Sequence, residues 1–318
     1  MYQEPIFLQP AFKERIWGGN QLQTRFGFSI PSPHTGECWG ISAHPEGLSR
    51  VKNGPLQGKT LDEVWKNHRE LFANQPGDAF PLLIKILDAQ KDLSVQVHPD
   101  DKMAMKLEGY PFGKTECWYI IDCDEGAEII LGHHASSKEE LKQMIRDEQW
   151  DLLLKKVSVK PGDFFYVTSG TIHAIGKGIM ILETQQSSDI TYRVYDYDRT
   201  DANGNKRPLH VEKSIAVTNV PDLESTIHPA VTKTKGLAIK QFVSEKYFTV
   251  QEWSINGETD ELKRNSGDFL LCSVIDGGGK MVTKDRSVSF TKGDFFILPA
   301  TIPSFRVQGN SRWIVSHP

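Results

Sequence analysis

The 318-residue chain lacks several features that would assign it to whole classes of protein. No stretch approaches 18 consecutive apolar residues, so we expect no transmembrane helix and no membrane partner. The first residues show no basic region followed by an apolar core, so no secretory signal is expected. A formal net charge of −4 offers no basic excess, which argues against nucleic acid as a partner. A few local Lys or Arg side chains could still hold a small anion.

Cysteine is also scarce. The four cysteines form no C-x-x-C pair, and their number and spacing fit reduced thiols in a cytoplasmic protein better than a disulfide framework. The length is sufficient for two domains, each with its own core. The sequence is compatible with a monomer but does not determine the oligomeric state.

Most of the chain consists of short runs rich in β-branched and aromatic residues, separated by Gly and Pro. Such runs predict strands, and their repeated spacing favours an antiparallel sandwich or barrel. The predicted strands are 81–89, 93–99, 116–122, 163–169, 179–186, 248–255, 268–276 and 294–300.

Two segments instead show the apolar spacing of helices. In the first, Thr60 and Glu63 form an S/T-x-x-E capping box, and in the second Ser137 and Glu140 form the same pattern. Both helices are expected to cover the β structure rather than to carry a site.

An internal repeat indicates how the chain is organised. PGDFFYVTSGTIHAI (161–175) and KGDFFILPATIPSFR (292–306) align without a gap. Each copy predicts a Gly-Asp turn, a buried strand and a second turn that aims a side chain inward, so two copies imply two β-barrel units. His173 of the first copy falls on Ser304 of the second, and only the first unit is therefore expected to bind metal.

The predicted boundary lies in the polar, proline-containing segment 220–235. We expect a metal-binding catalytic domain with short helices in residues 1–225. Residues 226–318 are expected to form a second, degenerate domain that lacks the metal ligands.

The candidate metal site begins with Gln96 and His98, which lie two apart on one strand and therefore share a face. Glu116 opens the next aromatic strand, and His173 is expected to close the Gly-Asp strand. Two imidazoles, a carboxylate and an amide oxygen suit Zn²⁺ with a position left open. The same ligand types suit non-haem Fe(II), so they do not decide the metal.

Several strings, spread along nearly the whole chain, then resemble a known family. They are IWGG (16–19), GECWGIS (36–42), LSVQVHPDD (93–101), GKTECWYI (113–120) and QQSSDITYRVYDYDR (185–199), together with GTIHAI (170–175). They resemble the type I mannose-6-phosphate isomerases, particularly the short bacterial form. The resemblance implies a mainly β fold of two cupin-type (jelly-roll) barrels with a few short helices. It also implies one zinc ion, with other divalent metals possible, held by Gln96, His98, Glu116 and His173.

The resemblance further implies an aldose–ketose isomerase that interconverts mannose 6-phosphate and fructose 6-phosphate. Proton transfer would run through an enediolate whose charge a metal ion and a guanidinium can stabilise. The family's active-site arginine falls on Arg193, whose alternative role is an ion pair with Asp189 or Asp196. Lys114 resembles a family active-site lysine, although an isolated lysine is more often solvated. Glu183 is a candidate proton shuttle or, alternatively, a residue that orients a metal-binding histidine.

Two other classes of function remain open at this point. A cupin dioxygenase could use the same His/Glu/His set around Fe(II), but it would not need Lys114 and Arg193. A non-enzymatic sugar-binding cupin would keep the ligands without exchanging a proton.

Overall fold

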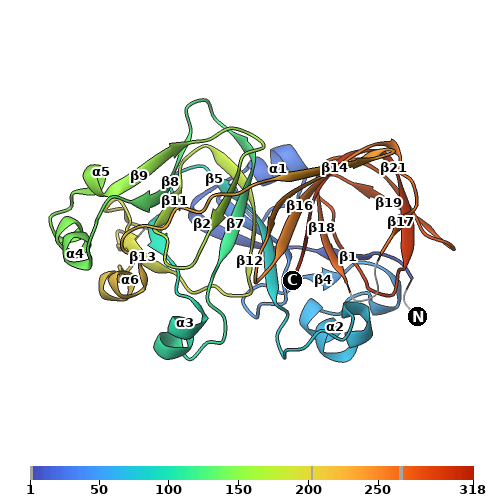
Figure 1. Ribbon diagram of the computed structural model, residues 1–318, viewed down its shortest axis with the longest axis horizontal. Coiled ribbons are helices and arrows are strands. Elements are labelled where there is room, and N and C mark those ends of the chain that lie inside the picture. Colours follow the sequence, from blue (N-terminus) through green and yellow to red (C-terminus); the bar gives the residue numbers. More distant parts are fainter. Residues whose placement is uncertain (1–2, 202, 265–267) are drawn as a thin grey trace.

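The β-branched and aromatic runs form strands throughout the chain, and every strand pair described is antiparallel. The computed structural model describes residues 3–201, 203–264 and 268–318 (Figure 1). The strands assemble into three sheets of ten, six and five strands. The predicted mainly β fold with a few short helices is confirmed.

Two of the sheets face each other in the N-terminal part of the molecule. The six-stranded sheet, in the order β10-β7-β12-β5-β3-β2, contains β2 (Ala11–Gly19), β3 (Thr35–Ile41), β5 (Leu82–Ala89), β7 (Glu116–Cys123), β10 (Phe164–Val167) and β12 (Ile179–Gln186). The five-stranded sheet, in the order β13-β6-β11-β8-β9, contains β6 (Val95–Val97), β8 (Glu128–His133), β9 (Leu154–Ser158), β11 (His173–Ile175) and β13 (Tyr192–Tyr195). Trp118 and Ile181 of the first sheet share one buried cluster with Ile129 and Ile175 of the second. The inner faces of the two sheets therefore enclose a common core.

The third sheet forms the C-terminal part. Its path runs β14-β15-β16-β21-β18-β20-β1-β4, with β17 paired to β21 and β19 to β18. Its strands are β1 (Ile6–Gln9), β4 (Arg50–Val51), β14 (Ala230–Thr234), β15 (Leu237–Ser244), β16 (Thr249–Glu258), β17 (Leu262–Lys263), β18 (Leu270–Val282), β19 (Ser287–Thr291), β20 (Phe295–Leu298) and β21 (Ser304–His317).

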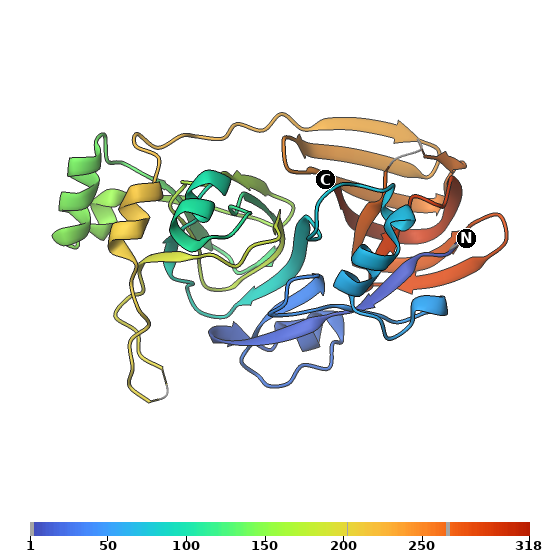
Figure 2. The same cartoon turned by 90° about the horizontal axis from the view of Figure 1, so that it is seen from below.

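β1 joins this sheet although it lies near the N-terminus, because its residues 6–8 pair with residues 295–297 of β20. Between α6 and β14 the chain crosses from the helical end of the molecule to the C-terminal sheet (Figure 2). The predicted boundary at 220–235 falls in this connecting segment. However, β1, which precedes the boundary in sequence, pairs with β20, which follows it. The division at residues 225 and 226 therefore stays a prediction.

Short helices cover the outer surfaces of the sheets. They are α1 (Gln21–Phe26), α2 (Leu61–Asn67), α3 (Asp101–Glu108), α4 (Lys138–Arg146), α5 (Trp150–Leu153) and α6 (Val211–Val217), with 3₁₀ turns at Gly54–Leu56 and Arg69–Phe72. No helix in the described parts of the chain is long and apolar enough to cross a membrane.

Both predicted helices are present, but their N-termini differ. At α2, the capping box of Thr60 and Glu63 is complete. At α4, the Ser137 hydroxyl accepts from the Glu140 N–H, whereas the Glu140 carboxylate accepts from the N–H of Ser136 rather than that of Ser137. The second box is therefore only half formed, because its carboxylate reaches one residue further back.

The internal repeat is visible in the strand boundaries. The expectation that His173 closes the Gly-Asp strand is wrong, because β10 ends at Val167 and His173 is the first residue of the next strand, β11. Ser304 is likewise the first residue of β21. Ser304 donates from Oγ to Glu261 Oε1 at 2.8 Å. The aligned position in the C-terminal unit thus holds a hydroxyl–carboxylate contact in place of an imidazole.

Candidate metal centre and cavity

Two histidines from the five-stranded sheet meet at their Nε2 atoms. His98 follows β6 and His173 opens β11, and the neighbouring Gln96 pairs with His173 across the two strands. Each Nδ1 lies against a main-chain carbonyl, at 2.8 Å from Ile190 O for His98 and 2.9 Å from Thr171 O for His173. A carbonyl only accepts, so each Nδ1 carries the proton and each Nε2 presents a lone pair. This is the tautomer that a metal-binding imidazole requires.

Glu116 completes the group from the six-stranded sheet, at the start of β7. The two Nε2 atoms lie 3.1 Å apart, and each is 3.5 Å from one oxygen of the Glu116 carboxylate. All three side chains are at most 1% exposed. In the described part of the chain, these residues form the one cluster of three or more His, Cys, Asp or Glu that could hold a metal ion. The convergence of two lone pairs and a carboxylate fits a divalent transition metal.

Gln96 reaches the same point from β6. Its Nε2 lies 3.3 Å from Nε2 of His173. Because an amide turned by 180° exchanges its oxygen and nitrogen, Gln96 can present an oxygen there as a fourth ligand. Its role as a ligand stays a prediction.

Lys114 lies beside the three candidate ligands. It is 3% exposed, so the alternative of a solvated lysine is wrong. Its Nζ is 3.0 Å from His98 Nε2 and forms an ion pair with Glu116. Burial would raise the pKa of Glu116, but the positive charge of Lys114, 2 residues away, is the main influence that lowers it overall. Glu116 is thereby kept as a carboxylate, the form that binds metal.

Glu183 lies on β12 within the same buried network. Its Oε1 is 3.0 Å from Lys85 Nζ and 3.6 Å from Lys114 Nζ. The Trp118 indole N–H lies between two carboxylates, 2.9 Å from Glu116 Oε1 and 3.2 Å from Glu183 Oε2. Burial, and then the negative charge of Glu116, raise the pKa of Glu183. No hydrogen bond joins Glu183 to either histidine in the parts of the chain that the structure describes, so nothing there supports the alternative that it orients one of them.

Lys85, the partner of Glu183, is not among the residues predicted from the sequence. It lies opposite Glu183 in the register of β5 and β12 and is 6% exposed at its side chain. Burial would lower the pKa of Lys85, but Glu183 and Glu37 together raise it above its usual range. One signal was available, because Lys85 is the single charge in the first seven residues of the apolar run PLLIKILDA (81–89).

A cavity of about 470 Å³ opens onto this network. Four predicted site residues line it, namely Gln96, Lys114, Glu183 and Arg193. Gln96 and Lys114 also contact the candidate metal ligands, so the cavity leads to the metal centre. The other charged residues of its lining were missed; they are Glu14, Arg15, Glu37, Lys85, Asp189 and Arg207.

Arg193 lies on β13, opposite Gln96 in the strand register. Its guanidinium donates to two neutral oxygens, Ser94 Oγ at 3.3 Å and Pro208 O at 2.8 Å. No ion pair to Asp189 or Asp196 forms in the described chain, so the alternative role for Arg193 is wrong. Asp196 instead binds Arg199 and Arg207.

Arg207 faces the same cavity and is held in place by Asp196. Its Nε and Nη2 lie 2.8 and 2.6 Å from the two Asp196 oxygens, a bidentate pair. Burial, and then the charge of Arg207, lower the pKa of Arg193. Arg193 and Arg207 thus direct two guanidinium groups toward one cavity.

Two antiparallel β units, one of which carries a buried His–Glu–His group beneath a cavity lined by both cationic and anionic side chains, define a cupin protein with a candidate metal centre. The family model for the phosphomannose isomerase type I catalytic domain matches residues 6–126, and that for the mannose-6-phosphate isomerase cupin domain matches residues 238–318. The chain belongs to the type I mannose-6-phosphate isomerases. Enzymes of this family interconvert mannose 6-phosphate and fructose 6-phosphate and depend on a metal.

Relatives match along the whole chain. A putative mannose-6-phosphate isomerase of Bacillus subtilis is 55% identical over 100% of both sequences. A mannose-6-phosphate isomerase of Streptococcus mutans is 54% identical over 99% of this chain and 98% of its own length. The crystal structure of a mannose 6-phosphate isomerase from Bacillus subtilis, 54% identical, superposes with a TM-score of 0.97 over 99% of this chain and 100% of that one.

Proposed function

We propose that this chain interconverts mannose 6-phosphate and fructose 6-phosphate at the cavity above His98, Glu116 and His173. The convergence of the two Nε2 lone pairs with the Glu116 carboxylate carries the proposal. These residues, with Gln96, would hold one Zn²⁺ ion, although the ligand types also admit other divalent metals. When bound, the metal supplies positive charge to the substrate oxygens, which stabilises the enediolate as a Lewis acid does.

The reaction moves one hydrogen between adjacent carbons. A base takes the proton from C2 of the open-chain aldose, the electron pair forms a C1–C2 double bond, and negative charge passes to O1. The proton of O2 then passes to O1 as C2 becomes a carbonyl, and the base returns its proton to C1. The atoms balance without a redox cofactor, which agrees with an acid–base site.

Glu183 is proposed as the group that carries this proton. It lines the cavity and is buried, and its raised pKa brings a carboxyl closer to the range in which it can both take and return a proton. Lys114 lines the same cavity and can donate to the oxygen that gains charge. Both roles are supported by position and charge.

The phosphate is proposed to bind between Arg193 and Arg207. A phosphate dianion would relieve the repulsion between these guanidinium groups and accept bidentate hydrogen bonds. Ser94, which contacts Arg193 and lines the cavity, adds a hydroxyl donor. This subsite explains why the enzyme would require a phosphorylated sugar.

A cytoplasmic location is proposed from the thiols and the substrate. All four cysteines are free, which fits a reducing compartment. Sugar phosphates are charged metabolites that cells retain inside their membranes.

The direct test is a coupled assay of fructose 6-phosphate formation by the purified, metal-loaded protein. Turnover of mannose 6-phosphate, with none of unphosphorylated mannose, is expected. The proposed function would be contradicted if mannose 6-phosphate were not turned over. It would also be contradicted if the iron-loaded protein consumed oxygen.

A further inference from the structure

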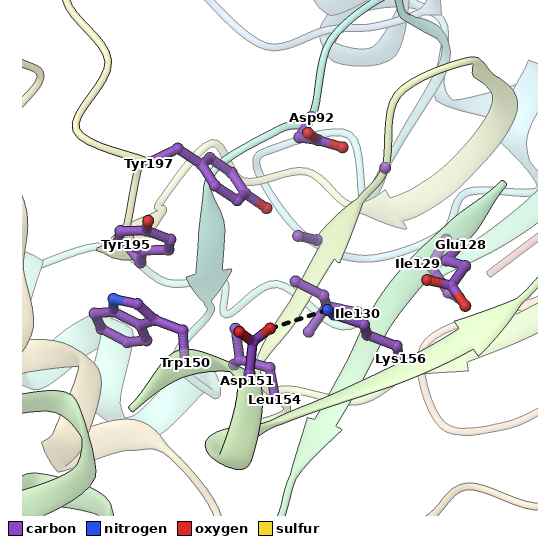
Figure 3. Close-up of a pocket in the computed structure, with 12 residues that line it drawn as sticks. Asp92, Glu128, Ile129, Ile130, Trp150, Asp151, Leu154, Lys156, Tyr195 and Tyr197 are labelled. Carbon is purple, nitrogen blue, oxygen red and sulfur yellow. Dashed lines mark hydrogen bonds and ion pairs between the residues drawn. The ribbon is translucent and has the colours of Figure 1, made fainter. Parts of the chain in front are cut away.

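A second cavity, of about 370 Å³, has its own set of lining residues (Figure 3). The strand β11 separates it from the catalytic cavity, because His173 belongs to the metal centre and Ile175 lines the catalytic cavity, whereas Ala174 lines the second cavity. On β13 the register shifts between Arg193 and Tyr195, and these residues also line different cavities. The second cavity is therefore a separate site on the outer face of the five-stranded sheet.

Three aromatic rings form one wall of this cavity. Trp150, from α5, stacks on Tyr195 with ring centroids 4.4 Å apart, and Tyr195 contacts Tyr197 at 4.8 Å (Figure 3). All three side chains are only partly buried. In the described structure neither the Trp150 indole N–H nor the two tyrosine hydroxyls have a hydrogen-bond partner. A partly exposed aromatic wall with unused donors is typical of a binding face.

The rest of the lining limits the chemistry of the ligand. Three carboxylates, of Asp92, Glu128 and Asp151, face the cavity with the single ammonium of Lys156, which binds Asp151 at 3.1 Å. This balance disfavours an anion such as the phosphorylated substrate. Glu128 is exposed and the Asp151 side chain is 93% exposed, so water screens their charges and they attract a cation only weakly.

We propose that this aromatic cavity, formed around Trp150, Tyr195 and Tyr197, binds a neutral, unphosphorylated sugar ring. The apolar face of a pyranose can lie on an aromatic ring, whose face is electron-rich. Its hydroxyl edge can bond to the free donors of the wall and to the carboxylates of the rim. The volume is within the range of small-molecule sites. The proposal does not depend on the isomerase activity.

Saturation-transfer NMR with methyl α-mannoside tests the site, because a methyl glycoside carries no phosphate and cannot open to an aldehyde. At about 10 mM sugar, a concentration suited to weak sites, transfer to the ring C–H protons of the sugar is expected. Trp150→Ala should raise the Kd by about tenfold or more, whereas Trp150→Phe should retain most binding. Trp150→Ala should also keep its turnover of mannose 6-phosphate, which shows that the variant is folded.

The location of the signal decides the outcome. Arg193→Ala should leave sugar binding unchanged, because Arg193 faces the other cavity. Absence of transfer, a signal that survives Trp150→Ala, or a signal lost in Arg193→Ala would each overturn the proposal. If spermidine bound instead of the sugar, and if Trp150→Ala abolished that binding, the cavity would be a site for an organic cation and the proposal of a sugar site would be overturned. If Trp150→Ala does not fold, Tyr195→Leu takes its place, because it removes another ring of the same wall. It should likewise weaken sugar binding and keep its turnover of mannose 6-phosphate.

Discussion

At the scale of single residues, His173 and His133 are both buried histidines with different partners. His173 Nε2 faces His98 and Glu116, whereas His133 Nε2 lies 2.8 Å from the carbonyl of Asn219. His173→Ala is therefore expected to lose bound metal and to lower turnover by about a thousandfold or more. Metal analysis and the coupled assay measure both effects.

His133→Ala is the matched control, since it also removes a buried imidazole. It should lose stability, by about 1–3 kcal/mol for the carbonyl left without its donor, but keep its metal. Equal metal loss in both variants would mean that His173 acts through folding rather than as a ligand.

Arg207 is the residue that most clearly distinguishes the proposed phosphate site. Arg207→Ala should raise KM for mannose 6-phosphate by about tenfold or more, because a charge-assisted bidentate contact is lost, with a smaller effect on kcat. Its neighbour Lys206 is 62% exposed, pairs with Asp198 and does not line the cavity, so Lys206→Ala removes the same charge as a control. The inhibition constant of inorganic phosphate should rise together with KM in Arg207→Ala and stay unchanged in Lys206→Ala. A similar rise in both variants would mean that the loss of a positive charge matters wherever it lies, and not a contact between Arg207 and phosphate.

At the scale of elements, the segment between β13 and α6 depends on one buried carboxylate. The Asp196 side chain is 5% exposed and binds both Arg199 and Arg207. Burial would raise the pKa of Asp196, but these two arginines outweigh it and lower the pKa. A carboxyl group whose pKa is lower in the folded protein than in the unfolded chain stabilises the fold at any pH above its unfolded pKa. That stabilisation is lost as the pH falls through the folded pKa.

Asp196→Asn should accordingly lower the free energy of unfolding by about 1.5–3 kcal/mol at neutral pH. The difference from the wild-type protein should hold above about pH 5. It should shrink below about pH 4, where Asp196 protonates in the unfolded chain and then, at still lower pH, in the folded protein. Urea denaturation across this range measures it. Asp198→Asn, at an exposed ion pair, is the control and should change the free energy of unfolding little. If the stability lost in Asp196→Asn did not vary with pH, the stabilising role of the Asp196 carboxylate would be contradicted.

The sequence predicted elements well where the pattern is local. Alternation and turn residues located the strands that carry Glu116 and Glu183 and the strand that His98 follows, and the repeat identified His173 and Ser304 as equivalent positions. Residues whose role comes from distant pairing were missed. Lys85 is meaningful only because Glu183 lies opposite it, 98 positions along the chain, and the bond of Arg207 to Asp196 depends on the path of a long loop. β1 joins a sheet that is built almost 300 residues later, and no local pattern indicates that.

At the scale of the whole molecule, the two β parts share a core. One buried cluster joins Leu182 and Ile84 of the six-stranded sheet to Ile314 and Phe295 of the C-terminal sheet. Because the two parts pack through common side chains, we expect them to unfold in one cooperative transition.

Phe295→Ala tests this shared core and should cost about 3–5 kcal/mol. Hydrogen exchange should show the same loss of protection in β7 and in β18, which lie in different parts. Leu223→Ala, at a side chain 59% exposed, is the control and should change stability by less than about 0.5 kcal/mol. Loss of protection in β18 alone would show that the two parts unfold independently.

The central claim is that this chain exchanges a proton on a sugar phosphate only when His98, Glu116 and His173 hold a metal ion. The most direct measurement is deuterium incorporation at C2 of mannose 6-phosphate in D₂O, followed by NMR, before and after removal of divalent metals with a chelator. Exchange is expected to fall to the uncatalysed rate in the metal-free protein and to return when about one equivalent of Zn²⁺ per chain is restored. Undiminished exchange by protein shown to contain no metal would contradict it.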